Sequence, residues 1–444
     1  MLAEKNHSAP GLKRSLGLFE GITILIGITI GAGIYSTPQV IAGYQESFND
    51  ILWLWVIVGV FVYLGGLIYA ELGTRLPNTG GEYLYLSRAF GPYVGFIFGW
   101  AQLFIIRTSP AAGLAIITVD YFEHFVNLTP FTHTALAILV ILLLGTLNYV
   151  GIKQASIYQN ISTIIKVGGL FLLVVAGLIM VQGQENLLAE ELPSTSELGP
   201  FATFGATMML IVFSYLGWDR VGYSAGEMKD PKRTIPLSLF WGIALVILTY
   251  LLAIFLYHYV LGMEGVRETK RVASDTATVL FGPVGAAIIA ISVMFSASGS
   301  INGTMMTAPR VYYAMAKDKL FFRWFDYVHP TFRTPSRAII AHCVWAIVIL
   351  LVRQNFENIV AGMTFAVLIF YLFTTLALFK LRKQGVGGEG VYKVPLYPIL
   401  PIFYFVGLLL LVFIRGYYEW EKSLIDLAFI ATGIPFAWWF VSRR

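Results

Sequence analysis

The sequence predicts an all-α integral membrane protein with twelve transmembrane helices. Composition is the first reason, because 57% of the 444 residues are hydrophobic and 12% are charged, whereas a soluble domain carries about 25% charged residues. The second reason is a series of apolar windows, each long enough to cross a bilayer and separated from the next by a short polar loop. These windows lie near residues 17–43, 51–73, 93–122, 134–150, 157–181, 201–226, 237–261, 279–313, 336–352, 358–381, 396–416 and 424–441.

The distribution of basic residues orients these spans. If the N-terminus is cytoplasmic, most of the Lys and Arg residues fall in cytoplasmic loops and only a small minority falls in the opposite loops. The positive-inside rule therefore predicts that both termini are cytoplasmic. The charged stretch from Glu4 to Arg14 is too polar for a secretory signal. We accordingly expect the first apolar window to remain as a span, in a plasma or bacterial inner membrane.

The first span contains helix breakers at its centre. Gly31 and Gly33 lie two residues apart and are followed by Ser36-Thr37-Pro38. Relative to alanine, glycine costs a helix about 1 kcal/mol and proline about 3 kcal/mol. An interrupted helix leaves unpaired backbone groups, which a membrane tolerates only where they are buried in protein or line a polar cavity. The freed N–H groups suit an anion and the freed carbonyls a cation, so a zwitterion such as an amino acid suits both. The alternative is a seam of small residues for helix packing.

The sixth span carries a similar interruption. The stretch from Phe213 to Trp218 is followed by Asp219 after only about fourteen apolar residues. The two interrupted spans lie five apart, and each interruption is followed by polar residues and a proline. This correspondence favours a substrate site at the bilayer midplane over a packing seam. It predicts one transporter domain, 1–444, with two inverted five-helix repeats at 15–181 and 200–382 and two further helices at 396–441.

Three polar residues inside the spans need partners. Lys166 lies mid-span, where a lysine costs roughly 2.5–3.5 kcal/mol, so we expect it to face a cavity or a cluster of carbonyls as a fixed or titratable cation. The alternative is that its ammonium snorkels to the interface. Arg107 suggests a structural or gating role, with Asp120 or Glu71 as its partner. Asn302, among small and hydroxyl residues of the eighth span, either joins helices or lines the pocket.

Several function classes lack their signatures. The chain has no Walker loop and neither GxSxG nor HExxH, so we expect neither an ATP-driven pump nor an enzyme. Cys343 is the only cysteine, and the six histidines show no pair at ligand spacing, so we expect no metal and no other cofactor. The net charge of +5 reflects membrane topology, so the expected surroundings are a lipid bilayer and not nucleic acid.

The chain resembles the amino acid–polyamine–organocation superfamily and, within it, the L-type amino acid transporter family. This resemblance implies a LeuT-like fold of 5+5 inverted repeats with broken helices 1 and 6, followed by two more helices. It also implies sodium-independent, one-for-one exchange of α-amino acids. The resemblance rests on stretches that recur in order between Leu18 and about Arg382, namely Ile30 to Tyr35, Tyr69 to Gly73 leading to Gly80 to Tyr83, Ile105 to Ser109, Phe213 to Trp218, Glu227 to Pro231, and Gly299 to Gly303.

The same resemblance implies which residues bind the substrate. The carboxylate would meet backbone N–H groups of the first break, and the ammonium would meet carbonyls at both breaks, those of Thr29, Phe213 and Leu216. Phe213 also matches the gating aromatic of the family. Lys166 matches a lysine near the place where sodium-coupled relatives hold a sodium ion. The full set expected at the two breaks is Thr29, Ile30, Gly31, Ala32, Gly33, Phe213, Ser214, Tyr215 and Leu216.

The sequence departs from the family pattern at informative positions. Ala32 replaces a serine, so a hydroxyl is lost while the backbone N–H stays. Leu216 stands where many members have glycine and would fill part of the side-chain pocket. Asp219 stands where asparagine is common and would bring a carboxylate near the pocket. Animal members join a heavy subunit through a cysteine after the third span, and residues 123–133 contain none. We therefore expect a bacterial member that works without a disulfide-linked heavy subunit.

The expected activity is exchange of neutral L-amino acids by alternating access around the two breaks. Lys166 would substitute for a metal ion and join the fifth span to the first. Two other activities remain open from the residues. One is proton-coupled amino acid symport with Lys166 as the proton carrier. The other is an amine or polyamine permease, for which Asp219 would supply a carboxylate.

Overall fold

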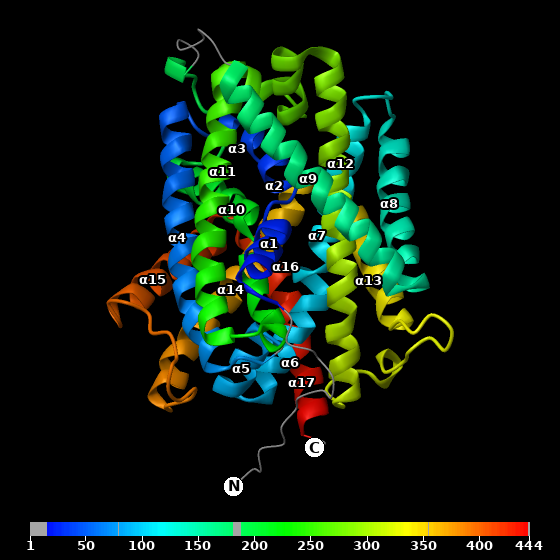
Figure 1. Ribbon diagram of the computed structural model, residues 1–444, viewed down its shortest axis with the longest axis vertical. Helices are drawn as coiled ribbons and strands as arrows, with labels where there is room; N and C mark the ends of the chain where they lie inside the picture. The colour runs from blue at the N-terminus through cyan, green and yellow to red at the C-terminus, as the bar shows by residue number, and fades with distance from the viewer. Residues whose placement is uncertain (1–15, 79, 181–187, 354, 443–444) are drawn as a thin grey trace.

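The computed structural model describes residues 16–78, 80–180, 188–353 and 355–442, and these residues are almost wholly helical (Figure 1). Twelve of the helical spans are long and apolar enough to cross a membrane, as the sequence predicts. Up to residue 180 the helices are α1 (Leu18–Thr29), α2 (Gly33–Ser36), α3 (Pro38–Tyr44), α4 (Phe48–Arg75), α5 (Glu82–Phe90), α6 (Pro92–Ala101), the π-helical turn Gln102–Ile106, α7 (Thr108–Phe122), α8 (Pro130–Val150) and α9 (Ile152–Met180).

The second part of the chain contains the longest helices. Its elements are α10 (Pro200–Tyr215), the 3-10 helix Trp218–Glu227, α11 (Pro231–Glu268), α12 (Val272–Lys317), the 3-10 turn Arg323–Phe325, α13 (Ser336–Arg353), α14 (Phe356–Lys383), α15 (Ile399–Tyr418), α16 (Trp420–Ala431) and α17 (Gly433–Val441). Helix α12 runs for 46 residues but turns sharply at Gly282, where φ is 70°. A short helix therefore precedes the eighth span, which explains why the predicted window starts only near residue 279.

Both interrupted spans are confirmed as interrupted. The first window, 17–43, is divided into α1, α2 and α3, and the sixth, 201–226, is divided into α10 and the 3-10 helix. Proline at the first position of α3, after the first break, starts that helix with its fixed φ, and α10, before the second break, also starts at a proline. The division of the chain into repeats at 15–181 and 200–382 stays a prediction.

The first span lies in the middle of the bundle. Helix α1 is flanked by α11 and by the 3-10 helix that follows α10, and α2 reaches α10 and α12 (Figure 1). A Cβ on Gly242 would lie 2.9 Å from a methyl carbon of Leu25, so the small residue lets α11 approach α1 closely. The short helix α5 and the last helix α17 lie at the lower end of the view, and α3 lies toward the upper end (Figure 1).

Candidate functional site

The first break separates α1 from α2. Helix α1 ends at Thr29, and Ile30 leaves the helical region with φ −70° and ψ 88°. Helix α2 starts at Gly33, with Ala32 as its N-cap. The first N–H groups of a helix have no partner within it. The backbone from Gly31 to Gly33 therefore offers N–H donors, and the end of α1 offers carbonyl acceptors.

The second break follows α10. Leu216 is extended, with φ −63° and ψ 140°, and its N–H donates to the Phe213 carbonyl at 3.0 Å. Gly217 has φ 126°, a conformation that residues with a Cβ rarely adopt. The chain then continues as the 3-10 helix from Trp218. The end of α10 therefore leaves further backbone carbonyls without the regular hydrogen bonds of a helix.

Glycines bring the two breaks into direct contact. A Cβ on Gly217 would lie 3.1 Å from the carbonyl carbon of Ile28, at the end of α1. A Cβ on Gly33 would lie 2.6 Å from the Cα of Ser214, on α10. The hydroxyl oxygens of Thr37 and Ser214 lie 3.0 Å apart, which adds a hydrogen bond to the second contact. The part of the first span before its break therefore meets the residues after the second break, and the part after it meets α10.

Tyr250 of α11 joins the breaks from one side. Its hydroxyl oxygen lies 2.9 Å from the Thr29 carbonyl oxygen and 3.0 Å from that of Ser214. One hydroxyl proton serves one acceptor at a time, so Tyr250 can alternate between the two breaks. This residue was not predicted from the sequence, because a single tyrosine in an apolar window looks like an ordinary core residue.

Lys166 of α9 contacts the first span from another direction. Its ammonium donates to the backbone carbonyl oxygen of Gly27, and its side chain has no exposed surface. This contact with a carbonyl matches the partner expected for a mid-span lysine, and it excludes the snorkelling alternative. Helix α9 is itself held on α12, where the Ser292 hydroxyl donates to the Ile165 carbonyl at 3.0 Å.

The residues predicted at the breaks differ in exposure. Gly31, Phe213 and Leu216 are half-buried. The buried residues of the predicted set are Thr29, Ile30, Ala32, Gly33, Ser214 and Tyr215. Their side chains are enclosed by protein, so their contribution to a ligand comes mainly from the backbone.

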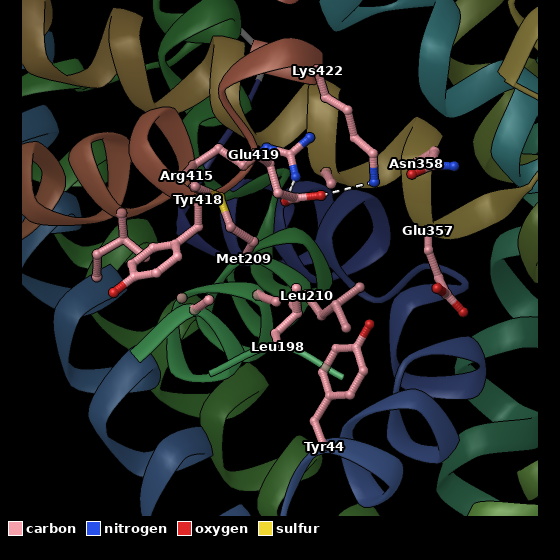
Figure 2. Close-up of a pocket in the computed structure, with 15 residues that line it drawn as sticks. Tyr44, Leu198, Met209, Leu210, Glu357, Asn358, Arg415, Tyr418, Glu419 and Lys422 are labelled. Atoms are coloured by element: carbon pink, nitrogen blue, oxygen red, sulfur yellow. Dashed lines mark hydrogen bonds and ion pairs between the residues drawn. The ribbon is translucent and has the colours of Figure 1, made fainter. Parts of the chain in front are cut away.

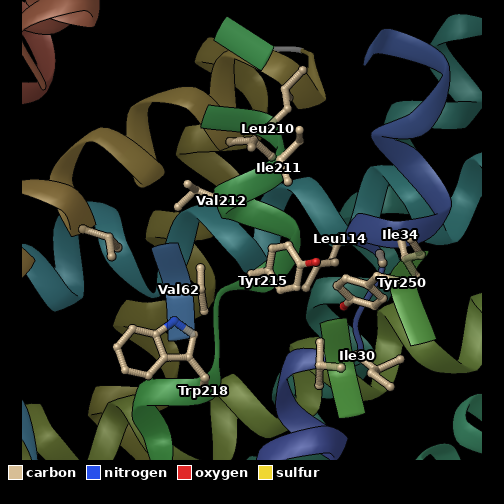
Figure 3. Close-up of a cluster of buried hydrophobic side chains, with 14 of the residues drawn as sticks. Ile30, Ile34, Val62, Leu114, Leu210, Ile211, Val212, Tyr215, Trp218 and Tyr250 are labelled. Carbon is tan, nitrogen blue, oxygen red and sulfur yellow. The ribbon is translucent and has the colours of Figure 1, made fainter. Parts of the chain in front are cut away.

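Aromatic rings surround the second break. The Tyr215 ring packs against Trp55 at 5.7 Å and Tyr250 at 5.2 Å between centroids, within the buried cluster of Figure 3. Its side chain therefore belongs to the core. The Phe213 ring meets Phe356 of α14 edge to face, at 5.6 Å and 77°. This second pair joins the end of α10 to the start of α14, and the gating role of Phe213 stays a prediction.

Asn302 lies between helices. Its amide donates to the Ala155 carbonyl at 3.0 Å and to the Gln159 side chain at 2.9 Å, and its oxygen accepts from Asn148 at 2.8 Å. It is fully buried. Of the two roles left open for Asn302, the structure therefore favours the joining of α12 to α8 and α9.

Asp219 belongs to a buried polar cluster beyond the second break, on the side of α5. The Glu82 carboxylate of α5 accepts hydrogen bonds from Thr374 at 2.7 Å and Tyr69 at 2.9 Å. Burial, followed by repulsion from Asp219, raises the pKa of Glu82 to about 8. Glu82 was not predicted from the sequence, because its glycine-rich loop gives no sign of burial.

Arg107 joins the same cluster, and the partners expected for it are wrong. Its guanidinium donates to Gln102 at 2.7 Å and lies 5.6 Å from the ring centre of Tyr223. Asp120 instead contacts His133 at 2.8 Å. The Glu71 carboxylate instead pairs with two arginines, Arg75 at the end of α4 and Arg382 at the end of α14. The π-helical turn before Arg107 rotates its side chain toward Gln102, a change that a regular helical pattern does not predict.

The chain is similar to known proteins along most of its length. The profile of the family described as "Amino acid permease" matches residues 16–434. The serine/threonine exchanger SteT of Bacillus subtilis is 32% identical over 400 residues, which cover 89% of this chain and 90% of the relative. The human b(0,+)-type amino acid transporter 1 is 30% identical over 445 residues, covering 98% and 89%. The mouse large neutral amino acids transporter small subunit 2 is 27% identical over 447 residues, covering 98% and 82%.

Proposed function

The chain belongs to the amino acid permease family, within the amino acid–polyamine–organocation superfamily, and from this premise we propose that it exchanges neutral L-amino acids one for one without sodium. It is a multi-pass membrane protein, and the three relatives named above are transporters or exchangers by name, not enzymes. The name of the Bacillus relative, a serine/threonine exchanger, makes small hydroxyl-bearing amino acids the first substrates to test.

The observation that carries the proposal is the meeting of two helix breaks beside a buried cation. The backbone N–H groups of Gly31, Ala32 and Gly33 would bind the carboxylate, and the carbonyls of Thr29, Phe213 and Leu216 would bind the ammonium. Leu216 stands at one of these contacts, where many members of the family have glycine. A substrate with a small or medium side chain therefore fits best.

Lys166 supports independence from sodium. Its ammonium is a cation attached covalently to the chain, and it binds the carbonyl oxygen of Gly27 close to the end of α1. The same contact fastens α9 to α1, so movement of α1 has to break it or carry α9 along. In our proposal, Phe213 closes the outer path over bound amino acid, and the inner half of the first span then swings to open the inner path.

The wider arrangement is part of the same proposal. The two five-helix repeats at 15–181 and 200–382 would move against each other around the breaks, in a cell membrane and with both termini cytoplasmic. We also propose that the chain works without a disulfide-linked heavy subunit. Cys343 is the only cysteine of the chain, and its side chain is buried against Gly145 of α8.

Uptake into proteoliposomes tests the proposal. Labelled L-serine is supplied outside in sodium-free buffer, with unlabelled L-serine, a diamine or no solute inside, and with or without an inward proton gradient. We expect uptake that requires internal amino acid and ignores the gradient. Uptake into empty vesicles that rises with the gradient would show proton-coupled symport instead. Uptake driven by the internal diamine alone would show an amine permease.

A further inference from the structure

The loop between α12 and α13 carries exposed apolar and basic side chains together. It comprises residues 318–335, all of which the structure describes, and it projects sideways from the lower end of the bundle, beyond α13 (Figure 1). Its exposed large apolar side chains are Trp324, Val328 and Phe332. Its exposed basic side chains are Lys319, Arg323 and Arg333. An exposed apolar patch edged by polar residues marks contact with a membrane or a protein.

Contacts with α8 and α13 fix the conformation of this loop. The Thr334 hydroxyl donates to the Tyr149 carbonyl at the end of α8, at 2.8 Å, and the His329 N–H donates to the Thr334 carbonyl at 2.9 Å. The guanidinium of Arg337, on α13, lies 4.1 Å from the ring centre of Tyr327. The exposed side chains therefore stand on a preorganised backbone, which lowers the entropy cost of binding a partner.

Two of the basic residues have backbone conformations that favour glycine. Lys319 has φ 59° and Arg333 has φ 57°, in the left-handed region where a residue with a Cβ is less stable than glycine. Lys319 directly follows the C-cap of α12, the position at which helices commonly have glycine. A charged side chain is therefore present at two places where the backbone disfavours it, which indicates a use for the charge.

The loop has an excess of positive charge. Between residues 317 and 337 the sequence has five basic and two acidic residues. No salt bridge between described residues involves the three exposed basic side chains of the loop. Basic residues of α15 and α16 differ in this respect, because the Glu419 carboxylate pairs with both Arg415 and Lys422 (Figure 2). The loop therefore offers its charges to an anion from outside the chain.

The length of α12 places the loop near the lipid headgroups. A Cβ on Gly31 would lie 3.6 Å from the Ser300 hydroxyl oxygen, so Ser300 of α12 lies beside the first break, which we expect at the bilayer midplane. Helix α12 ends 17 residues later, at Lys317, which is about 26 Å along the helix. Headgroups reach about 20–22 Å from the midplane, and a helix tilt of about 20° brings Lys317 closer to that level. The loop therefore starts close to the outer edge of the headgroups, and its sideways projection keeps it over lipid.

We propose that residues 318–335 bind anionic phospholipid headgroups of the surrounding bilayer. The three exposed basic side chains contact the headgroup phosphates, and the three exposed apolar side chains enter the zone between headgroups and acyl chains. Lipid is favoured over a protein partner because the loop lies beside the bundle and near headgroup level, where lipid is always present. The inference goes beyond the proposed exchange and does not depend on it, since lipid binding needs no transport.

A fluorescent probe in the loop tests its choice of lipid. Cys343 is the only cysteine of the chain, so Thr331→Cys, at an exposed position, can carry a single thiol-reactive fluorophore when combined with Cys343→Ala. The full chain is placed in nanodiscs of phosphatidylcholine that contain rising fractions of spin-labelled phosphatidylglycerol or spin-labelled phosphatidylcholine, which quench the fluorophore on contact. Each basic residue near an anionic surface adds up to about fivefold to the attraction, and salt weakens it. We expect half-quenching at about a 10-fold lower fraction of the anionic lipid, and equal fractions would overturn the inference.

Removal of the basic side chains tests their role. The combined variant Lys319→Gln, Arg323→Gln and Arg333→Gln should abolish the preference for the anionic lipid and leave quenching by the neutral lipid unchanged. A preference that survives in this variant would overturn the inference. Arg323→Gln alone should weaken the preference by about threefold, and it decides the question if the combined variant does not fold.

Three basic residues outside the loop provide the matched control. The combined variant Arg88→Gln, Lys383→Gln and Lys393→Gln removes the same charge at exposed positions elsewhere in the chain. We expect it to keep the wild-type preference for the anionic lipid. A loss equal to that of the loop variant would assign the preference to the net charge of the whole protein and would overturn the loop as the binding surface.

An apolar variant and a soluble anion test the rest of the inference. Trp324→Ser should weaken quenching by both lipids, because the ring no longer enters the bilayer, and unchanged quenching by both would contradict its insertion. Sodium phosphate and sodium chloride at equal ionic strength should weaken the lipid preference equally, because both screen charge. A larger effect of phosphate would show a site for small anions and would overturn the lipid surface.

Discussion

The ammonium of Lys166 donates a hydrogen bond to the backbone carbonyl oxygen of Gly27, in a contact that is closed to solvent. Replacing Lys166 by Met removes the donor and leaves a buried carbonyl unpaired, at a cost of about 1–3 kcal/mol. We expect about a 10- to 100-fold loss of L-serine exchange at equal amounts of reconstituted protein. Lys153→Met, at an exposed lysine of the same helix, should retain exchange. Normal exchange in Lys166→Met would show that this cation does not support the first break.

Tyr250 can be tested by removing one atom. In Tyr250→Phe, the carbonyls of Thr29 and Ser214 lose the hydroxyl between them, while the ring stays in the core. We expect exchange to fall about 10-fold or more, because a lost buried hydrogen bond costs about 1–3 kcal/mol. Tyr257→Phe is the matched control, since Tyr257 is also buried on α11 but its hydroxyl has no partner in the protein. Equal rates in the two variants would contradict a bridging role for Tyr250.

The close approach of the two breaks at Gly33 can be tested by comparing Gly33 with another glycine inside a membrane span. A Cβ on Gly33 would lie 2.6 Å from the Cα of Ser214, and a backbone atom cannot move aside as a side chain can. We expect Gly33→Ala to separate the two breaks, abolish exchange and lower the thermal unfolding midpoint. A Cβ on Gly168 would meet nothing within 4 Å, so Gly168→Ala should keep exchange and stabilise α9 by up to about 1 kcal/mol. Exchange at the wild-type rate in Gly33→Ala would mean that the breaks do not need this close approach.

The sequence predicts the two helix breaks and the buried Lys166 better than it predicts the contacts that hold the breaks in place. Gly31 and Gly33 at a span centre are costly enough to indicate an interruption, and a mid-span lysine has to find a partner. Tyr250 gives no such signal, because tyrosine is common in helix cores and only the fold brings its hydroxyl between two carbonyls. The partners of Arg107 were wrong because a π-helical turn changes the direction of its side chain. The binding roles of the residues at both breaks stay predictions until exchange is measured.

The buried cluster around Glu82 predicts a dependence on internal pH. Its pKa of about 8 lies above the value of 4.5 for a carboxyl in water, so the buried arrangement is fully stable below about pH 4.5 and loses stability as the pH rises through 8. We infer that opening of the path on the side of α5 hydrates this cluster, so that opening becomes easier as the pH rises. We expect exchange to increase between about pH 6 and pH 9 inside the vesicles at constant external pH.

Glu82→Gln tests this dependence, because the amide cannot ionise but can still accept from Tyr69 and Thr374. We expect its rate to stay nearly constant over the same range of internal pH. Glu389→Gln, at an exposed carboxylate, should keep the wild-type profile. The groups facing Glu82 across the cluster include Asp219, Tyr69 and Arg107. A rise with pH that survives in Glu82→Gln would therefore assign the dependence to one of these neighbours.

Leu216 should limit the size of the transported side chain. It is half-buried at the second break, where many members of the family have glycine, and each added or removed methylene in such a pocket changes selectivity by about 1–3 kcal/mol. We expect Leu216→Ala and Leu216→Gly to lower the KM for L-leucine relative to that for L-serine by about 10-fold or more. Both variants are needed because glycine also loosens the backbone, whereas alanine changes only the side chain. A shift in Leu216→Gly alone would reflect backbone freedom, and unchanged selectivity in both variants would show that this side chain points away from the substrate.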